Sequence, residues 1–329
     1  MNFKSRTITL LAILTSLSSH LVFGQDVKRW DGYAQPGDTR QVRGPSSPKW
    51  LEAVGFLSPT DKPKTSYCTI NLVTNELYEH SRVALTNSHC LINNNAVNFK
   101  TFNYKTFNDY ENHFIKNNLI TFTSNTGKKV IVKPYKVFWL DEVSKSNRFR
   151  DYAIIILDRV IKKNEIAPLL YDLHSEHTMR EYLFSDDFEI VDEEDLRMRE
   201  SYRETLAGYS CDKNASLGNN CKNLTYDSNC TPILSNENMD ENGEQSLYRY
   251  EVENCFSYPG SSGGALVQSF YEWDGEENES VFIIGVNRGA TSKILKNGQY
   301  DSSKNTIVPV HNFLVHLDSA VNEYNKKQR

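Results

Sequence analysis

The chain has 329 residues, of which 39% are hydrophobic and 12% aromatic, and a formal net charge of -5. It is long enough to bury a substantial core. Its mildly acidic balance, with no block of Lys and Arg, argues against nucleic-acid binding and against an anionic membrane surface, because both need clustered positive charge.

Residues 1–24 have the pattern of a signal peptide. Lys4 and Arg6 precede an apolar run over residues 8–17, and small residues at positions 22 and 24 suit cleavage before Gln25. The apolar run is too short to span a bilayer comfortably, which argues against a membrane anchor. We therefore expect a secreted protein, extracellular or periplasmic, with no membrane association after cleavage.

The rest of the chain reads as a leader followed by strands. Residues 25–50 contain Gly, Pro, Ser, Arg and two Trp without clear periodicity, and are predicted to be an irregular leader or a pro-segment. Helical spacing is convincing only near the C-terminus, between Val310 and Val321. Short runs rich in apolar, β-branched and aromatic residues predict strands at 53–57, 68–73, 81–86, 129–132, 152–157, 265–267 and 281–286.

Long polar stretches separate several of these runs. The stretches 93–119, 185–201 and 232–247 are predicted to be solvated loops. Many short strands with long loops indicate an all-β fold, either a sandwich or closed barrels.

The cysteines follow the signal peptide and are even in number. In a secreted protein an even number predicts disulfides, here three, and zinc would require close Cys-x-x-Cys pairs that the sequence lacks. His174 and His177 have no third ligand nearby, and a calcium-like loop after Asn238 has Arg249 where a bidentate glutamate is needed. We expect no metal and no cofactor. The cysteines are Cys68, Cys90, Cys211, Cys221, Cys230 and Cys255.

Three segments together offer the parts of an activated serine. His89 follows the run 81–86, Asp151 stands at the mouth of the run 152–157, and Gly-Ser-Ser-Gly-Gly at 260–264 makes a tight turn before an apolar strand. A serine nucleophile needs a base, and a histidine base needs a carboxylate to hold its tautomer. Each segment alone is a weak signal, but three at strand-to-loop junctions are a strong one.

In the order His, Asp, Ser, these segments resemble the trypsin/chymotrypsin-like serine proteases. The family's Thr-Ala-Ala-His-Cys stands here as Thr-Asn-Ser-His-Cys at 86–90, its Asp-x-Ala motif as Asp-Tyr-Ala at 151–153, and its Gly-Asp-Ser-Gly-Gly as the turn at 260–264. The resemblance covers roughly residues 51–322. It implies an all-β, chymotrypsin-like fold of two antiparallel six-stranded β-barrels, at about 51–162 and 163–310, and a C-terminal helix at about 311–325.

The resemblance also implies an activity. A secreted serine endopeptidase would act on protein or peptide substrates as a monomer without a cofactor. Ser262 would attack the scissile carbonyl, His89 would take its proton, and Asp151 would stabilise the imidazolium. The backbone N–H groups of Gly260 and Ser262 would bind the developing oxyanion.

Substrate-binding residues and one disulfide are implied as well. The segment Asn287, Arg288 and Gly289 looks like the strand that receives the substrate backbone, and Phe256 and Ser257 are candidates for the base of the specificity pocket. Cys68–Cys90 matches the family's bridge beside the histidine. The other four cysteines allow three pairings, of which Cys221–Cys255 with Cys211–Cys230 is favoured.

The sequence departs from the family's pattern at two places near the nucleophile. Ser261 stands where the animal digestive enzymes carry an aspartate that pairs with the N-terminus created by zymogen cleavage, and the chain has no comparable activation site. This predicts a protein competent without that switch, as in bacterial branches such as the glutamyl endopeptidases. Cys255 lies seven places before Ser262 rather than four, which leaves the register of the pocket undecided.

Two other functions stay open. An inactive protease homologue could bind a partner through the same cleft, although retention of all three triad residue types argues against it. A small-ester hydrolase would carry a Gly-x-Ser-x-Gly elbow and a different triad order.

Overall fold

The computed structural model describes residues 32–63, 66–92, 104–140, 150–171, 201–234, 250–273, 277–290 and 301–326. The predicted signal peptide lies outside these ranges, as do His174, His177 and the segment that begins at Asn238. None of the helices in these ranges is long and apolar enough to cross a membrane.

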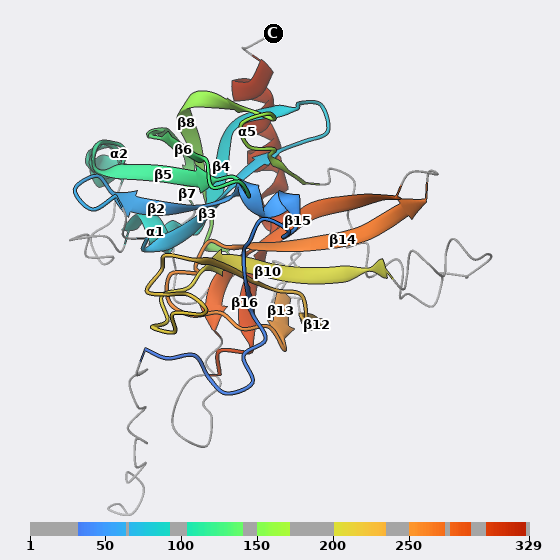
Figure 1. Ribbon diagram of the computed structural model, residues 1–329. Coiled ribbons are helices and arrows are strands. Elements are labelled where there is room, and N and C mark those ends of the chain that lie inside the picture. Colours follow the sequence, from blue (N-terminus) through green and yellow to red (C-terminus); the bar gives the residue numbers. More distant parts are fainter. Residues whose placement is uncertain are drawn as a thin grey trace, which may run out of the picture.

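The first half of the chain forms one curled antiparallel sheet, drawn in blue and green in Figure 1. Its strands pair in the order β6-β5-β2-β3-β4-β8-β7. Helices η1 (Lys49–Ala53), α1 (Ser88–Ile92) and α2 (Tyr104–Asn117) accompany it. The strands are β2 (Val54–Pro59), β3 (Cys68–Thr74), β4 (His80–Thr86), β5 (Asn118–Thr123), β6 (Lys129–Val132), β7 (Pro134–Leu140) and β8 (Ala153–Lys162).

The second half forms another antiparallel sheet, which lies below the first in Figure 1. Its strands pair in the order β1-β11-β10-β14-β15-β16-β13-β12. They are β1 (Gln41–Val42), β10 (Arg203–Tyr209), β11 (Leu224–Asp227), β12 (Thr231–Leu234), β13 (Tyr250–Glu253), β14 (Ala265–Trp273), β15 (Glu277–Ala290) and β16 (Asn305–Pro309).

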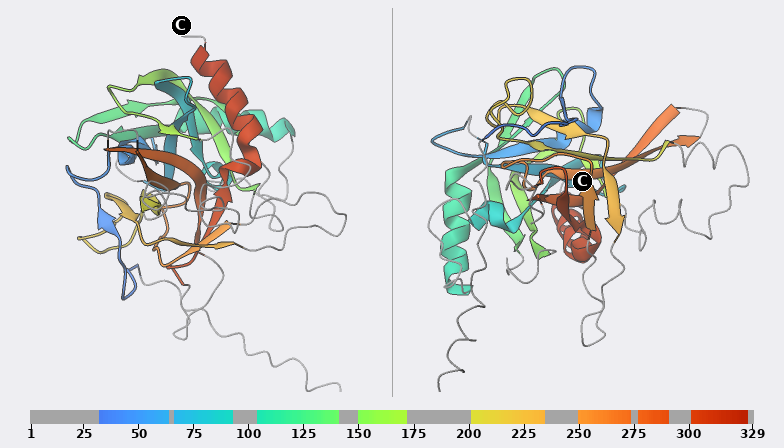
Figure 2. Two further views of the ribbon diagram at one scale, coloured as in Figure 1. Left: turned by 90° about the vertical axis from the view of Figure 1, so that its right-hand side faces the viewer. Right: turned by 90° about the horizontal axis from the view of Figure 1, so that it is seen from below.

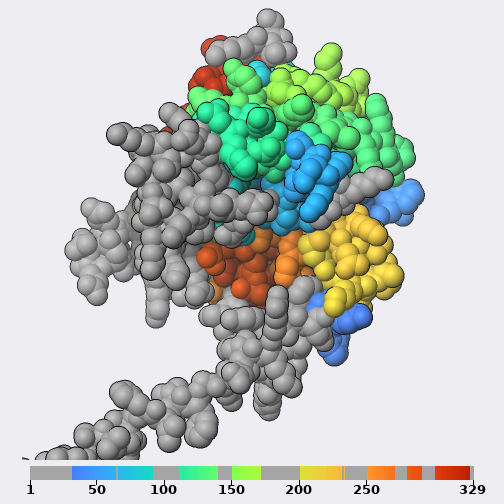
Figure 3. Space-filling model, turned by 90° about the vertical axis from the view of Figure 1, so that its left-hand side faces the viewer, coloured from blue at the N-terminus to red at the C-terminus, as the bar shows by residue number. Residues whose placement is uncertain are grey.

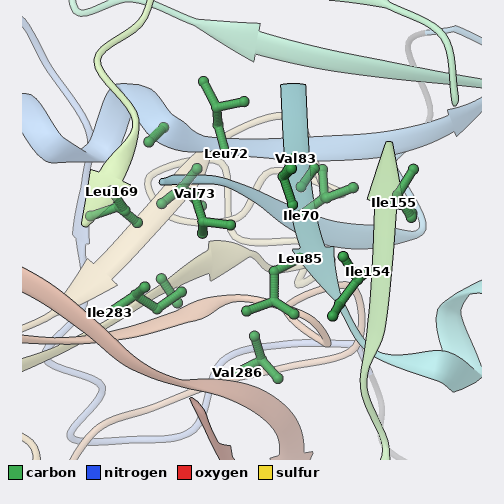
Figure 4. Packing of buried hydrophobic residues seen from close by; sticks show 14 of the residues in the cluster. Ile70, Leu72, Val73, Val83, Leu85, Ile154, Ile155, Leu169, Ile283 and Val286 are labelled. Carbon is green, nitrogen blue, oxygen red and sulfur yellow. The ribbon is translucent and has the colours of Figure 1, made fainter. Parts of the chain in front are cut away.

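One strand and one core join the two sheets. β9 (Leu169–Leu170) runs parallel to both β3 and β15. Figure 4 shows Leu85 and Ile154 of the first sheet beside Val286 of the second, and all three side chains are buried. Burying one such side chain contributes about 1.5–3 kcal/mol to stability. The two strand ends that carry candidate catalytic residues in the first sheet are therefore held against the second.

The C-terminal segment closes the outer side of the first sheet (Figure 2). It consists of η4 (Val310–Phe313) and α5 (Leu314–Lys326). Leu317, Ala320 and Val321 are buried, and α5 packs against β4 and β8. The buried amide of Asn325 accepts the backbone N–H of Arg82 at 3.0 Å and fixes the helix to β4.

The predicted fold class is confirmed: the structure is mostly β, with two curled sheets and a C-terminal helix. Every run predicted as a strand lies wholly or largely in one. Within the described residues the two sheets hold seven and eight strands rather than six, partly because β1 of the leader adds an edge strand to the second. The stretch 93–119, predicted as a loop, contains α2, whose Phe114 is buried.

The disulfides follow the expected pattern at one place and depart from it at two. Cys68 is joined to Cys90, the pair that the resemblance implies. The favoured pairs Cys221–Cys255 and Cys211–Cys230 are wrong, because the structure joins Cys211 to Cys221 and Cys230 to Cys255.

Local backbone pairing explains this arrangement. The N–H of Cys221 donates to the carbonyl of Ser210, which returns the chain to Cys211 within a short loop. β12 and β13 pair with Thr231 opposite Glu253. Cys230 precedes β12 and Cys255 follows β13, so both lie just beyond the same end of this pair of strands. The pairing therefore depends on strand register, which the spacing of the cysteines does not specify.

Peptide mapping without reduction is expected to yield three cross-linked species. They would contain Cys68 with Cys90, Cys211 with Cys221, and Cys230 with Cys255. A peptide that links Cys221 to Cys255 would contradict this arrangement.

Candidate active site

His89 and Asp151 meet at the ends of neighbouring strands. β4 leads into α1, which carries His89, and β8 begins two residues after Asp151. β4 and β8 pair antiparallel with Thr86 opposite Ala153, so both residues emerge at the same edge. The His89 Nδ1 lies 2.6 Å from Asp151 Oδ2, and the His89 backbone N–H donates to Oδ1 at 3.0 Å.

Neighbouring polar side chains fix the two loops to each other. The Asn87 amide donates to the carbonyl of Asp151 at 2.7 Å, and the Ser88 hydroxyl donates to the carbonyl of Tyr152 at 2.6 Å. Both side chains are fully buried. The Asn-Ser pair of the histidine motif thus positions the carboxylate as well as the histidine.

Asp151 is nearly inaccessible to solvent, with 1% of its side chain exposed. Burial alone would raise the pKa of this carboxyl, but the hydrogen bonds and charge of His89, with the charge of Arg288, outweigh it and lower the pKa below its usual value. Asp151 is therefore ionised at neutral pH and can hold the imidazole in one tautomer and stabilise its cation.

Ser262 stands in a turn that only glycine can make at its flanks. Gly260 has φ +94° and Gly263 has φ +82°, a region that side chains rarely adopt. A Cβ on Gly263 would also lie 2.2 Å from the Thr69 carbonyl oxygen. Close approach to β3 and backbone conformation therefore both require glycine there.

Polar residues of β3 hold this turn from the other sheet. The Thr69 N–H donates to the carbonyl of Ser262 at 2.8 Å, and its hydroxyl donates to the carbonyl of Gly260 at 2.9 Å. The Asn71 amide donates to the carbonyl of Gly263 at 2.7 Å. We did not predict these supports, although polar residues alternating with apolar ones in an otherwise buried run were their signal.

Two backbone donors of the turn are left available. The N–H groups of Ser261, Gly263 and Gly264 donate to backbone carbonyls. Among the described residues, no acceptor takes the N–H of Gly260 or Ser262. Backbone N–H groups without another acceptor are the kind of donor that binds an oxyanion.

Arg288 contacts both the carboxylate and the serine. Its Nε lies 3.2 Å from Asp151 Oδ2, and its carbonyl accepts the Ser262 hydroxyl at 3.3 Å. The sequence pointed to its backbone alone, and the contact of its guanidinium with Asp151 was missed. In this arrangement the Ser262 hydroxyl donates to Arg288, and among the described residues it makes no hydrogen bond with His89.

An Arg288→Gln variant is expected to unfold in acid at a higher pH than the wild type. A carboxyl with a lowered pKa contributes stability above its unfolded value of about 3.9, and this is lost as pH falls through the folded value. Removing the Arg288 cation raises the pKa of Asp151 in the folded state. The stability that the ionised carboxylate contributes is therefore lost at a higher pH.

Unfolding followed by circular dichroism between pH 7 and pH 2 measures this shift. Arg159→Gln is the matched control, because Arg159 pairs with Glu165 at the exposed surface, where ion pairs contribute little. Equal acid midpoints for wild type and Arg288→Gln would rule out the electrostatic role of Arg288.

The residues expected to bind substrate lie near the turn, but the side chains of two of them, Ser257 and Asn287, make hydrogen bonds inside the protein. Ser257 is buried and its hydroxyl donates to Asn305. The Asn287 amide donates to the Ser261 hydroxyl at 3.2 Å, so it supports the turn. The Phe256 N–H donates to Asp227. Gly289 leaves space, since a Cβ there would lie 4.0 Å from the Ser262 hydroxyl.

Within the described residues, one group of potential metal ligands lies at this site: Cys68, His89 and Cys90. The two cysteine sulfurs are joined in a disulfide and cannot act as thiolate ligands. The group therefore does not fit a metal ion.

Comparisons with known proteins give little beyond this geometry. No protein-family description and no curated protein matches the sequence. Among solved structures, a mutant of human heparin binding protein (CAP37) is similar at 10% sequence identity with a TM-score of 0.49, over 87% of this chain and 96% of that chain.

Proposed function

We propose that this protein is a secreted serine endopeptidase that hydrolyses peptide bonds through Ser262, His89 and Asp151 and an acyl-enzyme. The observation that carries the proposal is the double hydrogen bond between His89 and the buried Asp151 carboxylate. This arrangement leaves Nε2 of the imidazole to act as a base.

The proposed steps use groups of the candidate active site. Ser262 leaves the Arg288 carbonyl, gives its proton to His89 Nε2, and its oxygen bonds to the substrate carbonyl carbon. The N–H groups of Gly260 and Ser262 bind the oxyanion, where one donor contributes roughly 2.7–4 kcal/mol to transition-state stabilisation. His89 then protonates the leaving amine, and water releases the acyl group by the same path.

The turn can form without an N-terminal ammonium. The Ser261 hydroxyl donates to the carbonyl of Tyr258 at 2.7 Å and accepts from the Asn287 amide. Its hydrogen-bonding needs are met internally, which supports a protease of the kind that needs no zymogen ion pair, as in the bacterial glutamyl-endopeptidase-like branches. The three disulfides suit an oxidising, extracellular compartment.

A catalytically inactive homologue that binds a partner is the second candidate. The observation that favours it is the Ser262 hydroxyl bound to the Arg288 carbonyl, with the Arg288 guanidinium against Asp151. If this state persisted with a ligand bound, the Ser262 hydroxyl would not be activated by His89.

Digestion of an unfolded protein by the purified chain separates the candidates. The proposed enzyme generates new internal N-termini, detectable by mass spectrometry, and Ser262→Ala generates none. Cleavage of small esters without peptide cleavage would favour an esterase. Binding of protein substrates without any turnover would favour the inactive homologue.

A further inference from the structure

The described part of the leader that precedes η1 is fixed to the second sheet and its loops. We call residues 32–43 the strap; it runs down along the second sheet as the blue trace in Figure 1, and its dark blue atoms border the yellow ones in Figure 3. β1 within it pairs with β11. Further hydrogen bonds join Gly32 to Lys213, Ala34 to Asn214, Gln35 to Tyr258 and Ser302, and Thr39 to Asp227.

Arg40 is the buried centre of the strap, with 1% of its side chain exposed. Its guanidinium donates to Asp38 at 2.7 Å and to Asp212 at 3.0 Å. The same group lies over the ring of Tyr258, 4.4 Å from its centroid. Leaving a buried charge without its partner costs free energy, so the guanidinium and the two carboxylates hold one another in place. The contact with the Tyr258 ring adds a cation–π interaction.

Tyr258 and Asp212, which Arg40 joins, are each connected to residues 260–264, which we call the nucleophile turn. On one side, the carbonyl of Tyr258 accepts the backbone N–H of Ser261 at 3.0 Å and its hydroxyl at 2.7 Å. On the other side, Asp212 follows Cys211, whose N–H donates to the carbonyl of Pro259 at 2.7 Å.

Cys211 also lies directly against Gly260. A Cβ on that glycine would lie 2.3 Å from the Cys211 sulfur, so Cys211 and the turn are in close contact. Arg40 therefore holds Tyr258 and Asp212 in place, and through them the turn that carries the two N–H groups proposed to bind the oxyanion.

We propose that Arg40 is a positioning residue for the nucleophile turn, and that the strap is a retained part of the working protein rather than a removed pro-segment. This inference rests on the proposed peptidase function, because the turn it orders is that of the proposed nucleophile. Arg40 touches neither Ser262 nor the substrate site and acts through Tyr258 and Asp212.

An Arg40→Met variant of the full chain tests this role. The second-order rate of labelling by a fluorophosphonate is expected to fall about 10- to 100-fold, less than the 10²–10³-fold typical for outright loss of an oxyanion donor. Arg40→Lys keeps the charge without the planar fork and is expected to restore part of the rate. Amide exchange in the turn, read at Ser261, Gly263 and Gly264, is expected to accelerate in Arg40→Met.

The matched control is Arg43→Met, the same substitution in the same strap. The Arg43 guanidinium donates to the carbonyls of Thr123 and Leu51 and, unlike that of Arg40, to neither Asp38 nor Asp212. We expect labelling and turn exchange within about twofold of the wild type, since its bonds go to backbone carbonyls outside the turn.

The outcomes separate this inference from the proposed function. Folded Arg40→Met with wild-type labelling and unchanged turn exchange would overturn it, as would an equal loss in Arg43→Met, which would indicate general destabilisation. If the wild type itself is not labelled, the proposed catalysis fails. Turn exchange then still decides whether Arg40 orders the turn.

Discussion

A Ser262→Ala variant is expected to lose about 10⁶-fold in peptide turnover and to keep its fold. Loss of a triad nucleophile typically has an effect of this size, because the remaining groups cannot act without it. The Ser262 hydroxyl makes one long hydrogen bond to the Arg288 carbonyl, so its removal has little effect on stability. Progress curves with a peptide substrate and thermal unfolding measure both quantities.

Ser261→Ala is the matched control for that substitution. Its buried hydroxyl donates to Tyr258 and accepts from Asn287, so its loss costs roughly 1 kcal/mol per hydrogen bond. We expect a lower unfolding temperature and turnover within about tenfold of the wild type, because the backbone N–H of Ser261 still donates to the carbonyl of Tyr258 and holds the turn. Loss of activity in Ser261→Ala with retention in Ser262→Ala would reverse the assignment of the nucleophile.

Asp151→Asn is expected to lower kcat by about 10⁴-fold. The Asp151 carboxylate accepts from both the backbone and the ring of His89, and an amide can accept through one atom only. If the amide NH₂ faces the ring, His89 takes the tautomer with its proton on Nε2 and cannot accept the serine proton.

The steady-state parameters distinguish this effect from a general disturbance of substrate binding. The backbone hydrogen bonds between Asn287 and the turn at 263–264 do not involve Asp151, so KM is expected to change less than kcat. A decrease in kcat below about tenfold would mean that Asp151 does not orient the base.

Much of the fold could be predicted because strand-forming runs are local in sequence, and the candidate catalytic residues could be named because each lies in a short motif. Runs such as 68–73 and 152–157 are rich in β-branched residues and form buried strands. His89 follows β4 and Asp151 precedes β8, and because these strands pair with Thr86 opposite Ala153 the two residues lie at one edge of the sheet. The helix α2 was missed because its polar, Asn-containing sequence has a single deeply buried side chain, Phe114, among its described residues.

The remaining features depend on contacts between distant segments. The disulfides of Cys211 and Cys255 follow from a turn and a strand register that cysteine spacing does not encode. Ser257 is directed inward by Asn305, far along the chain. Arg40 becomes a buried cation only where the strap meets Asp212. Neither composition nor periodicity specifies such partners.

The measurement that tests the proposed catalysis most directly is fluorophosphonate labelling of the wild-type protein, with the modified residue located by peptide mass spectrometry. We predict one adduct, on Ser262, and its absence in Ser262→Ala. An unlabelled protein with all three disulfides formed, or an adduct on Ser261, would contradict the assignment of Ser262 as an activated nucleophile.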